Sequence, residues 1–119
     1  MLAKLEEITD RYKGTVLVVD DTPNNLNVLF SHLRSAGFKV LVAQTGNNAL
    51  KSAEYSKPDL ILLDILMSGI DGFETCRRLK SNDITKDIPV IFMTGLSDSI
   101  NKVRGFELGA VDYVTKPIQ

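Results

Sequence analysis

A chain of 119 residues has the size of one globular domain. Its 14 basic and 15 acidic residues give a formal charge of -1, so we expect no nucleic-acid binding through this segment. Cys76 is the only cysteine, which excludes an internal disulfide and a cysteine-based zinc cluster. Neither a signal peptide nor an apolar stretch of membrane length is evident, so we expect a cytoplasmic protein without a membrane partner.

An amphipathic stretch, residues 2–12, comes first along the chain. Its apolar residues Leu2, Leu5, Ile8 and Tyr12 are three or four positions apart, which predicts a helix with one apolar face. A helix of about eleven residues is unstable alone in water, so it needs a surface to pack on. That surface belongs either to its own chain or to a second copy, and the alternative is a frayed tail.

Five short apolar runs follow, and each predicts a β-strand. The first four are continuous, which is typical of strands buried on both faces of a parallel sheet. The fifth contains Asp112 and is mixed, as an edge strand would be. The five runs are residues 16–19, 40–43, 60–63, 90–93 and 111–114.

Four helical patterns lie between these strands. The first begins at Thr22-Pro23 with a capping hydroxyl, the second is capped by Thr45, the third runs from about Gly72 to Lys80, and Ser97 caps the fourth. Helix by helix, the residues expected to face inward are Leu26, Leu29, Phe30 and Leu33; Ala49, Leu50 and Ala53; Phe73, Cys76 and Leu79; and Ile100, Val103 and Phe106. The alternation of strand and helix predicts an α/β fold, a parallel sheet with helices on both faces.

Polar residues stand where the predicted strands end, which is where function collects in open parallel sheets. They are Asp20, Asp21, Asp64, Thr94 and Lys116. Three carboxylates in one crevice repel each other unless a cation lies among them, and Mg²⁺ suits such oxygen ligands. Thr94 offers a hydroxyl donor and Lys116 a positive charge, and an Asp side chain can act as a nucleophile that forms an aspartyl phosphate.

Four sequence blocks resemble those of two-component receiver domains. They are VVDD at residues 18–21, LLDILMSGIDG at 62–72, MTG at 93–95 and YVTKP at 113–117. The resemblance implies a doubly wound, flavodoxin-like, five-stranded parallel sheet of order 2-1-3-4-5, for which a receiver is itself a standard example. We therefore expect residues 15–119 to form a receiver domain that lacks its last helix, and the amphipathic stretch predicts a helical extension before it, at residues 1–14. In receivers the last helix covers the same face as the first, so we expect the extension to cover the apolar surface left open there.

The resemblance also implies a role for each site residue. Asp64 is the phosphoacceptor, and Mg²⁺ is bound by Asp20, Asp21, Asp64 and the backbone carbonyl of Leu66. Lys116 contacts a phosphoryl oxygen, and its bond to Pro117 is expected to be cis.

Two further sets of residues are expected to govern the response to phosphorylation. Thr94 moves to bond the phosphoryl group, and Tyr113 follows it inward as the aromatic half of a switch. Leu66 and Leu96 occupy the two positions that flank the hydrolytic water in receivers, and because both are apolar we expect slow dephosphorylation. One departure from the family is Ser68, where Met-Pro is usual after the acceptor strand and loss of the proline is expected to loosen the loop.

The expected function is that of a phosphoacceptor module in a two-component phosphorelay. The phosphoryl group comes from a histidine kinase or a histidine phosphotransfer protein, since His32 is the sole histidine and is interpreted as a surface or packed residue. The output is an attached domain or a partner protein, homodimerisation is possible, and the domain promotes only its own phosphorylation and dephosphorylation. The alternatives are a phosphohydrolase with an aspartyl nucleophile, whose D-x-D pattern is not matched by adjacent Asp20 and Asp21, and a receiver that has lost phosphorylation and serves only in docking.

Overall fold

The computed structural model describes residues 2–95 and 99–115. All five strands form one parallel sheet in the order β2-β1-β3-β4-β5, as the resemblance implied. In chain order the elements are α1 (Leu2–Thr9), β1 (Thr15–Val19), α2 (Pro23–Ser35), β2 (Lys39–Ala43), α3 (Gly46–Ser56), β3 (Leu60–Asp64), α4 (Gly72–Lys80), β4 (Val90–Thr94), α5 (Ser99–Glu107) and β5 (Asp112–Thr115).

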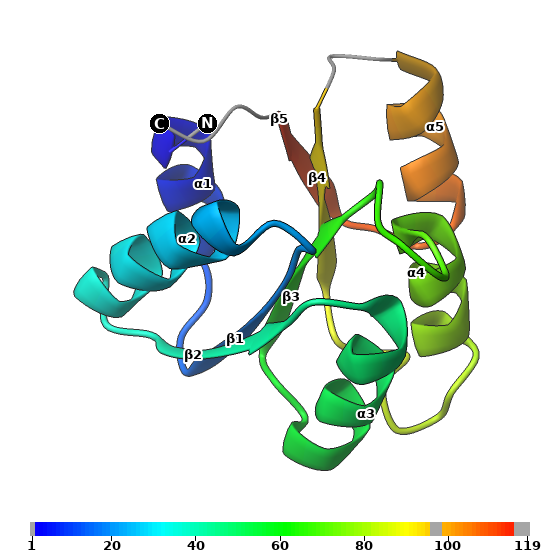
Figure 1. Cartoon of the computed structure of the whole chain (residues 1–119), viewed down its shortest axis with the longest axis horizontal. Coiled ribbons are helices and arrows are strands. Elements are labelled where there is room, and N and C mark those ends of the chain that lie inside the picture. Colours follow the sequence, from blue (N-terminus) through cyan, green and yellow to red (C-terminus); the bar gives the residue numbers. More distant parts are fainter. Residues whose placement is uncertain (1, 96–98, 116–119) are drawn as a thin grey trace.

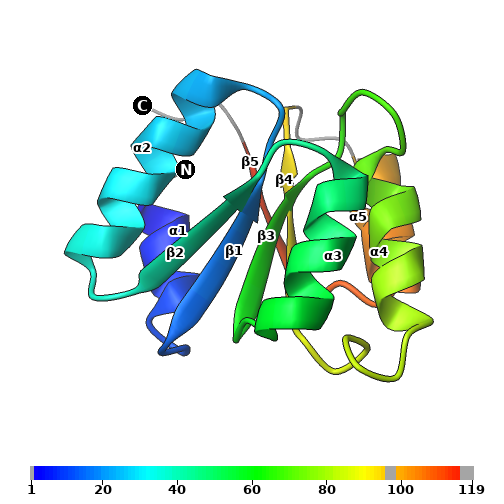
Figure 2. The same ribbon diagram turned by 60° about the horizontal axis from the view of Figure 1, so that its bottom comes forward.

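The helices form a layer on each face of the sheet. Helices α1 and α2 cover one face, and α3, α4 and α5 cover the other (Figures 1 and 2). Right-handed crossovers between parallel strands place successive helices in this way. The buried apolar residues accordingly fall into two clusters, one under each layer.

Helix α1 belongs to the first of these layers. Leu5 and Ile8 are 0% and 2% exposed, and they join a cluster that contains Leu29, Leu33 and Val114. These are residues of α2 and β5, so α1 packs within its own chain on the apolar strip that the sequence predicted it would cover. The helix ends at Thr9, earlier than predicted, and Tyr12 packs against the same cluster from the following turn.

The second layer is built largely as the sequence predicted. Helix α4 has the predicted bounds, and its residues Phe73, Cys76 and Leu79 are buried. Burial raises the pKa of the Cys76 thiol to about 11, so this cysteine is a neutral core residue at physiological pH. Helix α3 is capped by Thr45, whose hydroxyl accepts the Asn48 N–H at 3.1 Å.

Two predictions of burial are wrong. Strand β2 is not buried on both faces, because it pairs only with β1 at the edge of the sheet, and Val42 is 48% exposed. In α5, Val103 and Phe106 are exposed, and among residues 103–107, whose burial is described, the buried one is Gly105. A Cβ atom on Gly105 would collide with the Phe92 ring, so the missing side chain lets α5 approach β4 closely. The Ser97 cap and the Ile100 side chain lie outside the described residues.

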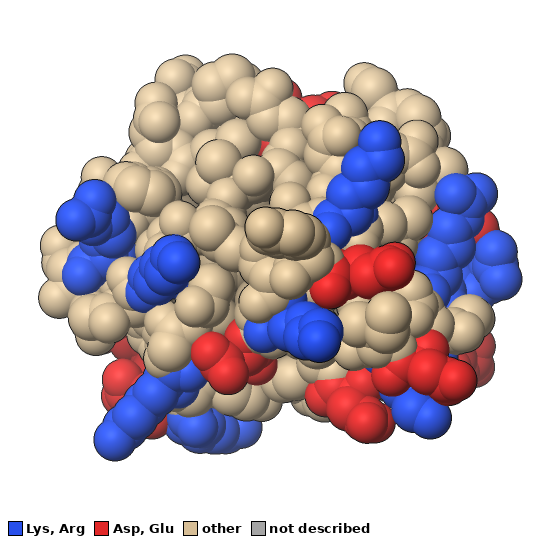
Figure 3. Space-filling view, turned by 90° about the horizontal axis from the view of Figure 1, so that it is seen from below, with Lys and Arg blue, Asp and Glu red and all other residues tan. Residues whose placement is uncertain are grey.

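The surface carries both signs of charge. In the view of Figure 3, acidic and basic side chains are interspersed over the lower part and the sides of the face, and the upper part carries few charges. No helix in the described ranges is long and apolar enough to cross a bilayer.

Candidate functional site

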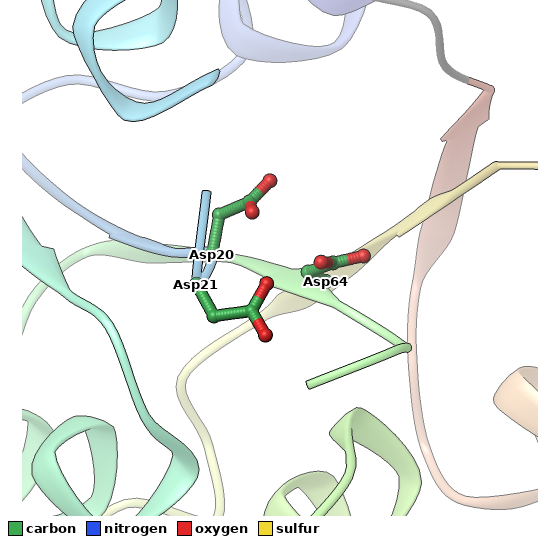
Figure 4. Close-up of side chains that lie close together, drawn as sticks. All are labelled: Asp20, Asp21 and Asp64. Atoms are coloured by element: carbon green, nitrogen blue, oxygen red, sulfur yellow. The ribbon is translucent and has the colours of Figure 1, made fainter. Parts of the chain in front are cut away.

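Three aspartates meet at the carboxyl ends of β1 and β3. Asp20 and Asp21 follow β1 directly, and Asp64 is the last residue of β3, the neighbouring strand. One carboxylate oxygen from each lies within 4.8 Å of the other two. Figure 4 shows the three side chains around a common space. Asp20, Asp21 and Asp64, called the acidic cluster below, are therefore brought together as the sequence predicted.

Asp20 is fixed by the start of α2. It is fully buried, and its carboxylate accepts the Thr22 backbone N–H at 2.9 Å and the Asn25 side-chain amide at 3.2 Å. Thr22 is the N-terminal cap by position, but its side chain makes no capping hydrogen bond, so that prediction is wrong. The polar partner at this turn is instead the Asp20 carboxylate, which holds the first turn of α2 against the end of β1.

Asp21 is more exposed than the other two and reaches the loop after β3. Its Oδ2 accepts the backbone N–H of Ser68 at 3.3 Å. Proline, the family's usual residue at this position, has no N–H to donate. The residue that was expected only to loosen the loop therefore also supplies a hydrogen bond between the loop and the acidic cluster.

The backbone of Asp64 lies directly against the start of α4. A Cβ atom on Gly72 would collide with the Asp64 carbonyl oxygen, and the Gly72 N–H donates to the carbonyl of Ile65 at 2.8 Å. Asp71 caps the helix by accepting the Glu74 N–H at 2.8 Å. The positioning role of Gly72 was missed, since a glycine after a capping residue is not distinctive without a structure.

Thr94 and Tyr113 lie on the side of the site toward β5. Thr94 ends β4, is 3% exposed, and lines a cavity of about 10 Å³ together with Tyr113 and Phe106. The Tyr113 ring meets the Phe106 ring edge-on at 6.1 Å between centroids. On α1, the Lys4 Nζ lies 3.9 Å from the centre of the Tyr113 ring and 3.7 Å from Asp112 Oδ1. That Lys4 reaches this residue was not predicted from the sequence.

The remaining predicted site residues are Leu66, Leu96 and Lys116. Leu66, two positions after Asp64, is 78% exposed. Lys116 and Leu96, like the Lys116–Pro117 bond, lie outside the described residues. The described part of the predicted site therefore comprises the acidic cluster, Leu66, Thr94 and Tyr113.

The donor set fits a hard divalent cation. Asp20 and Asp64 are 0% and 5% exposed, and carboxylates this close and this buried repel each other strongly unless a cation lies among them. Oxygen ligands in this number leave positions for water and a phosphoryl oxygen, as Mg²⁺ prefers.

Comparison with known proteins agrees with this geometry. The family model described as "Response regulator receiver domain" matches residues 16–119. The response regulator PleD of Caulobacter vibrioides is 43% identical over 103 residues, which are 87% of this chain and 23% of PleD. The protein PilH of Pseudomonas aeruginosa is 40% identical over 103 residues, which are 87% of this chain and 85% of PilH. The chain thus spans under a quarter of PleD and most of PilH.

Solved structures give the same result. A putative response regulator from Chloroflexus aurantiacus superposes with a TM-score of 0.85 at 37% identity, covering 91% of this chain and 88% of that one. The receiver domain of a sensor histidine kinase from Pseudomonas aeruginosa, with a magnesium ion coordinated in its active-site cleft, superposes with a TM-score of 0.81 at 29% identity, covering 91% and 88%.

Proposed function

The chain belongs to the receiver domains of response regulators, and from this we propose that Asp64 accepts a phosphoryl group from a phosphohistidine of a histidine kinase or histidine phosphotransfer protein. The observation that carries the proposal is the position of Asp64 within the acidic cluster, at the end of a central strand. Asp20 and Asp21 come from the end of the neighbouring strand, and their closeness to Asp64 supports the proposal that they help to bind a metal ion beside it.

The chemistry is a phosphoryl transfer between two side chains. An oxygen of the Asp64 carboxylate attacks phosphorus, and the bond from phosphorus to the donor's imidazole nitrogen breaks. The nitrogen keeps the electron pair of that bond, and because the other ring nitrogen of the phosphohistidine carries a proton, the products are an aspartyl phosphate and a neutral histidine. Such transfers depend on positioning and on stabilisation of charge on the phosphoryl oxygens.

The residues proposed to hold Mg²⁺ are Asp20, Asp21, Asp64 and the backbone carbonyl of Leu66. When bound, the ion would neutralise the negative charge that the acidic cluster and the phosphoryl group bring together. The hydrogen bonds from Thr22 and Asn25 hold Asp20 in place. We assign Lys116 to a phosphoryl oxygen on the family resemblance.

The proposed response begins with Thr94 and ends with Tyr113. The cavity that the two residues share is about 10 Å³, roughly the volume that one water needs. An aromatic ring does not fit into that space while Thr94 stays where it is. If Thr94 moves toward a phosphoryl group on Asp64, space opens beside it and the Tyr113 ring can move inward.

We propose a receiver unit at residues 15–119 and a helical extension at residues 1–14. The receiver unit passes the signal to an attached domain or a partner protein, either alone or as a homodimer. The reaction is confined to its own Asp64, with no outside substrate turned over. The slow dephosphorylation expected from Leu66 and Leu96 would then set the duration of the signal.

Intact-mass measurement after incubation with acetyl phosphate tests this function. We expect one phosphoryl group on the chain in Mg²⁺ and none in chelator. Asp64→Asn should take up none, and Asp83→Asn, which changes an exposed aspartate, should behave as the unaltered chain. Equal uptake by Asp64→Asn would contradict the assignment, and no uptake by the unaltered chain would indicate a receiver that serves only in docking.

A further inference from the structure

Helix α1 is held by apolar contacts under it and by polar contacts at its sides. Leu5 and Ile8 lie in the buried cluster with Val114 of β5. On the α2 side, the Glu6 carboxylate lies 3.4 Å from the His32 Nε2, a close contact without hydrogen-bond geometry. On the β5 side, the polar contact is made by Lys4 alone among the described residues of α1.

Lys4 reaches around the open edge of the sheet. β5 is an edge strand, and its successive side chains point to opposite faces. Val114 packs under α1, whereas Tyr113 packs with Phe106 of α5 in the opposite layer. The Lys4 Nζ nevertheless lies 3.9 Å from the centre of the Tyr113 ring and 3.7 Å from Asp112 Oδ1. A single side chain therefore connects α1 with a residue on the other side of the sheet.

The contact depends on where the Tyr113 ring lies. A cation and an aromatic face attract within about 6 Å, and the attraction falls once the ring turns away. The inward movement proposed for Tyr113 takes the ring toward Thr94 and away from the outer edge. Lys4 would then keep the Asp112 carboxylate and lose the ring.

We infer that Lys4 couples the docking of α1 to the phosphorylation of Asp64. This inference rests on the function proposed above. In the resting chain, Lys4 and Tyr113 hold each other, which favours docked α1 and the outward ring. In the phosphorylated chain the contact breaks and α1 is docked less tightly. Because α1 has eight residues and is too short to be a stable helix alone, its undocked state is unfolded.

The coupling acts in both directions. If phosphorylation weakens the docking of α1, weaker docking must favour the phosphorylated state by the same factor. A partly exposed cation–aromatic contact implies a factor of about five. The apolar contacts of Leu5 and Ile8 and the Glu6–His32 contact do not involve Tyr113, so we expect α1 to loosen rather than to be lost.

Hydrogen exchange of the α1 amides, with and without beryllium fluoride and Mg²⁺ as a stable mimic of the phosphoryl group, tests the coupling. The Asp10 N–H, bonded to the Glu6 carbonyl at 2.9 Å, is a suitable probe of the last turn. We expect its exchange to rise about five-fold on activation, the factor given by the lost contact. In Lys4→Met, exchange of the Asp10 amide should be faster already without beryllium fluoride and should change little when it is added. This variant should also bind beryllium fluoride about five-fold more tightly than the unaltered chain does.

Two further variants serve as controls. Lys4→Arg keeps the charge and the ring contact and should retain the response, whereas Lys51→Met, on α3 in the other layer, removes a lysine without touching α1. If beryllium fluoride binds but α1 exchange does not change, the coupling is wrong and the proposed function stands. If beryllium fluoride does not bind to the unaltered chain, the proposed function fails and the coupling with it.

Discussion

The acidic cluster and the outer edge of the sheet at β5 are held in different ways. Asp20, Asp21 and Asp64 stand at the ends of β1 and β3, each of which pairs with a strand on both sides. Tyr113 stands on β5, which pairs only with β4, and its side chain contacts the Phe106 ring and Lys4. The acidic cluster, where we propose the chemistry, therefore lies at strands paired on both sides, whereas Tyr113, in which we propose the response, lies on an edge strand.

The largest effect is expected at the constrained end, from Asp21→Ala. This substitution removes one of three carboxylates. Mutating a residue that only orients a metal ligand lowers metal affinity about 10- to 100-fold, so for the loss of a ligand we expect Mg²⁺ to bind at least about 100-fold more weakly. Calorimetric titration with Mg²⁺ measures this, with Asp10→Ala, an exposed aspartate after α1, as the control. Normal phosphorylation of Asp21→Ala in chelator would show that the cluster is not the metal site.

At the β5 side, Leu5→Ala tests whether α1 is a part of the fold. Truncating a fully buried leucine costs about 2–5 kcal/mol, and we expect about 2 kcal/mol, because the loss cannot exceed the free energy that docks α1. Denaturant unfolding gives the value, and Glu7→Ala on the exposed face of the same helix should change it by less than about 0.5 kcal/mol. Equal stability of Leu5→Ala and the unaltered chain would mean that α1 is only a tail.

Gly72→Ala sharpens the claim that the acceptor strand is tightly constrained. The added Cβ atom would collide with the Asp64 carbonyl, and overpacking of this kind costs about 1–3 kcal/mol; we expect about 1.5. Gly95→Ala is the matched control, because a Cβ atom there has no neighbour within 4 Å. Comparable melting temperatures for Gly72→Ala and Gly95→Ala would show that α4 and β3 are not packed as closely as described.

The same contrast explains which features the sequence could predict. Strand ends such as Asp20-Asp21 and Asp64 are marked by the continuous apolar runs before them, so the acidic cluster was expected from the residues, whereas the sheet order was implied by the family resemblance. The predictions of a Thr22 cap and of the inward face of α5 were wrong. The hydrogen bond of Thr22 to Asp20 and the close approach of Gly105 to Phe92 both depend on the tertiary arrangement, which the local sequence does not show. From its position in the sequence Lys4 is expected to be a solvated helix residue. Its contacts with Tyr113 and Asp112 form only because α1 packs beside β5.

The smallest effect is expected from Leu66→Asn. Leu66 is 78% exposed beside the acceptor strand, and an apolar side chain cannot orient a hydrolytic water. An amide at that position should speed loss of the phosphoryl group by several-fold, about 1 kcal/mol in the barrier. The decay of the phosphorylated chain after removal of acetyl phosphate measures the rate, with Leu66→Met as the apolar control. An unchanged or slower decay in Leu66→Asn would count against the expected role of Leu66.

The assignment of Asp64 as the phosphoacceptor is tested by locating the phosphoryl group on the chain. Borohydride reduces an aspartyl phosphate to homoserine, so peptide mass spectrometry of the reduced, phosphorylated chain identifies the acceptor. We expect homoserine at Asp64 alone, with Asp20 and Asp21 recovered as aspartate. Homoserine at Asp20 or Asp21, or a phosphoryl group that survives on another residue type, would contradict the assignment of Asp64 as the phosphoacceptor.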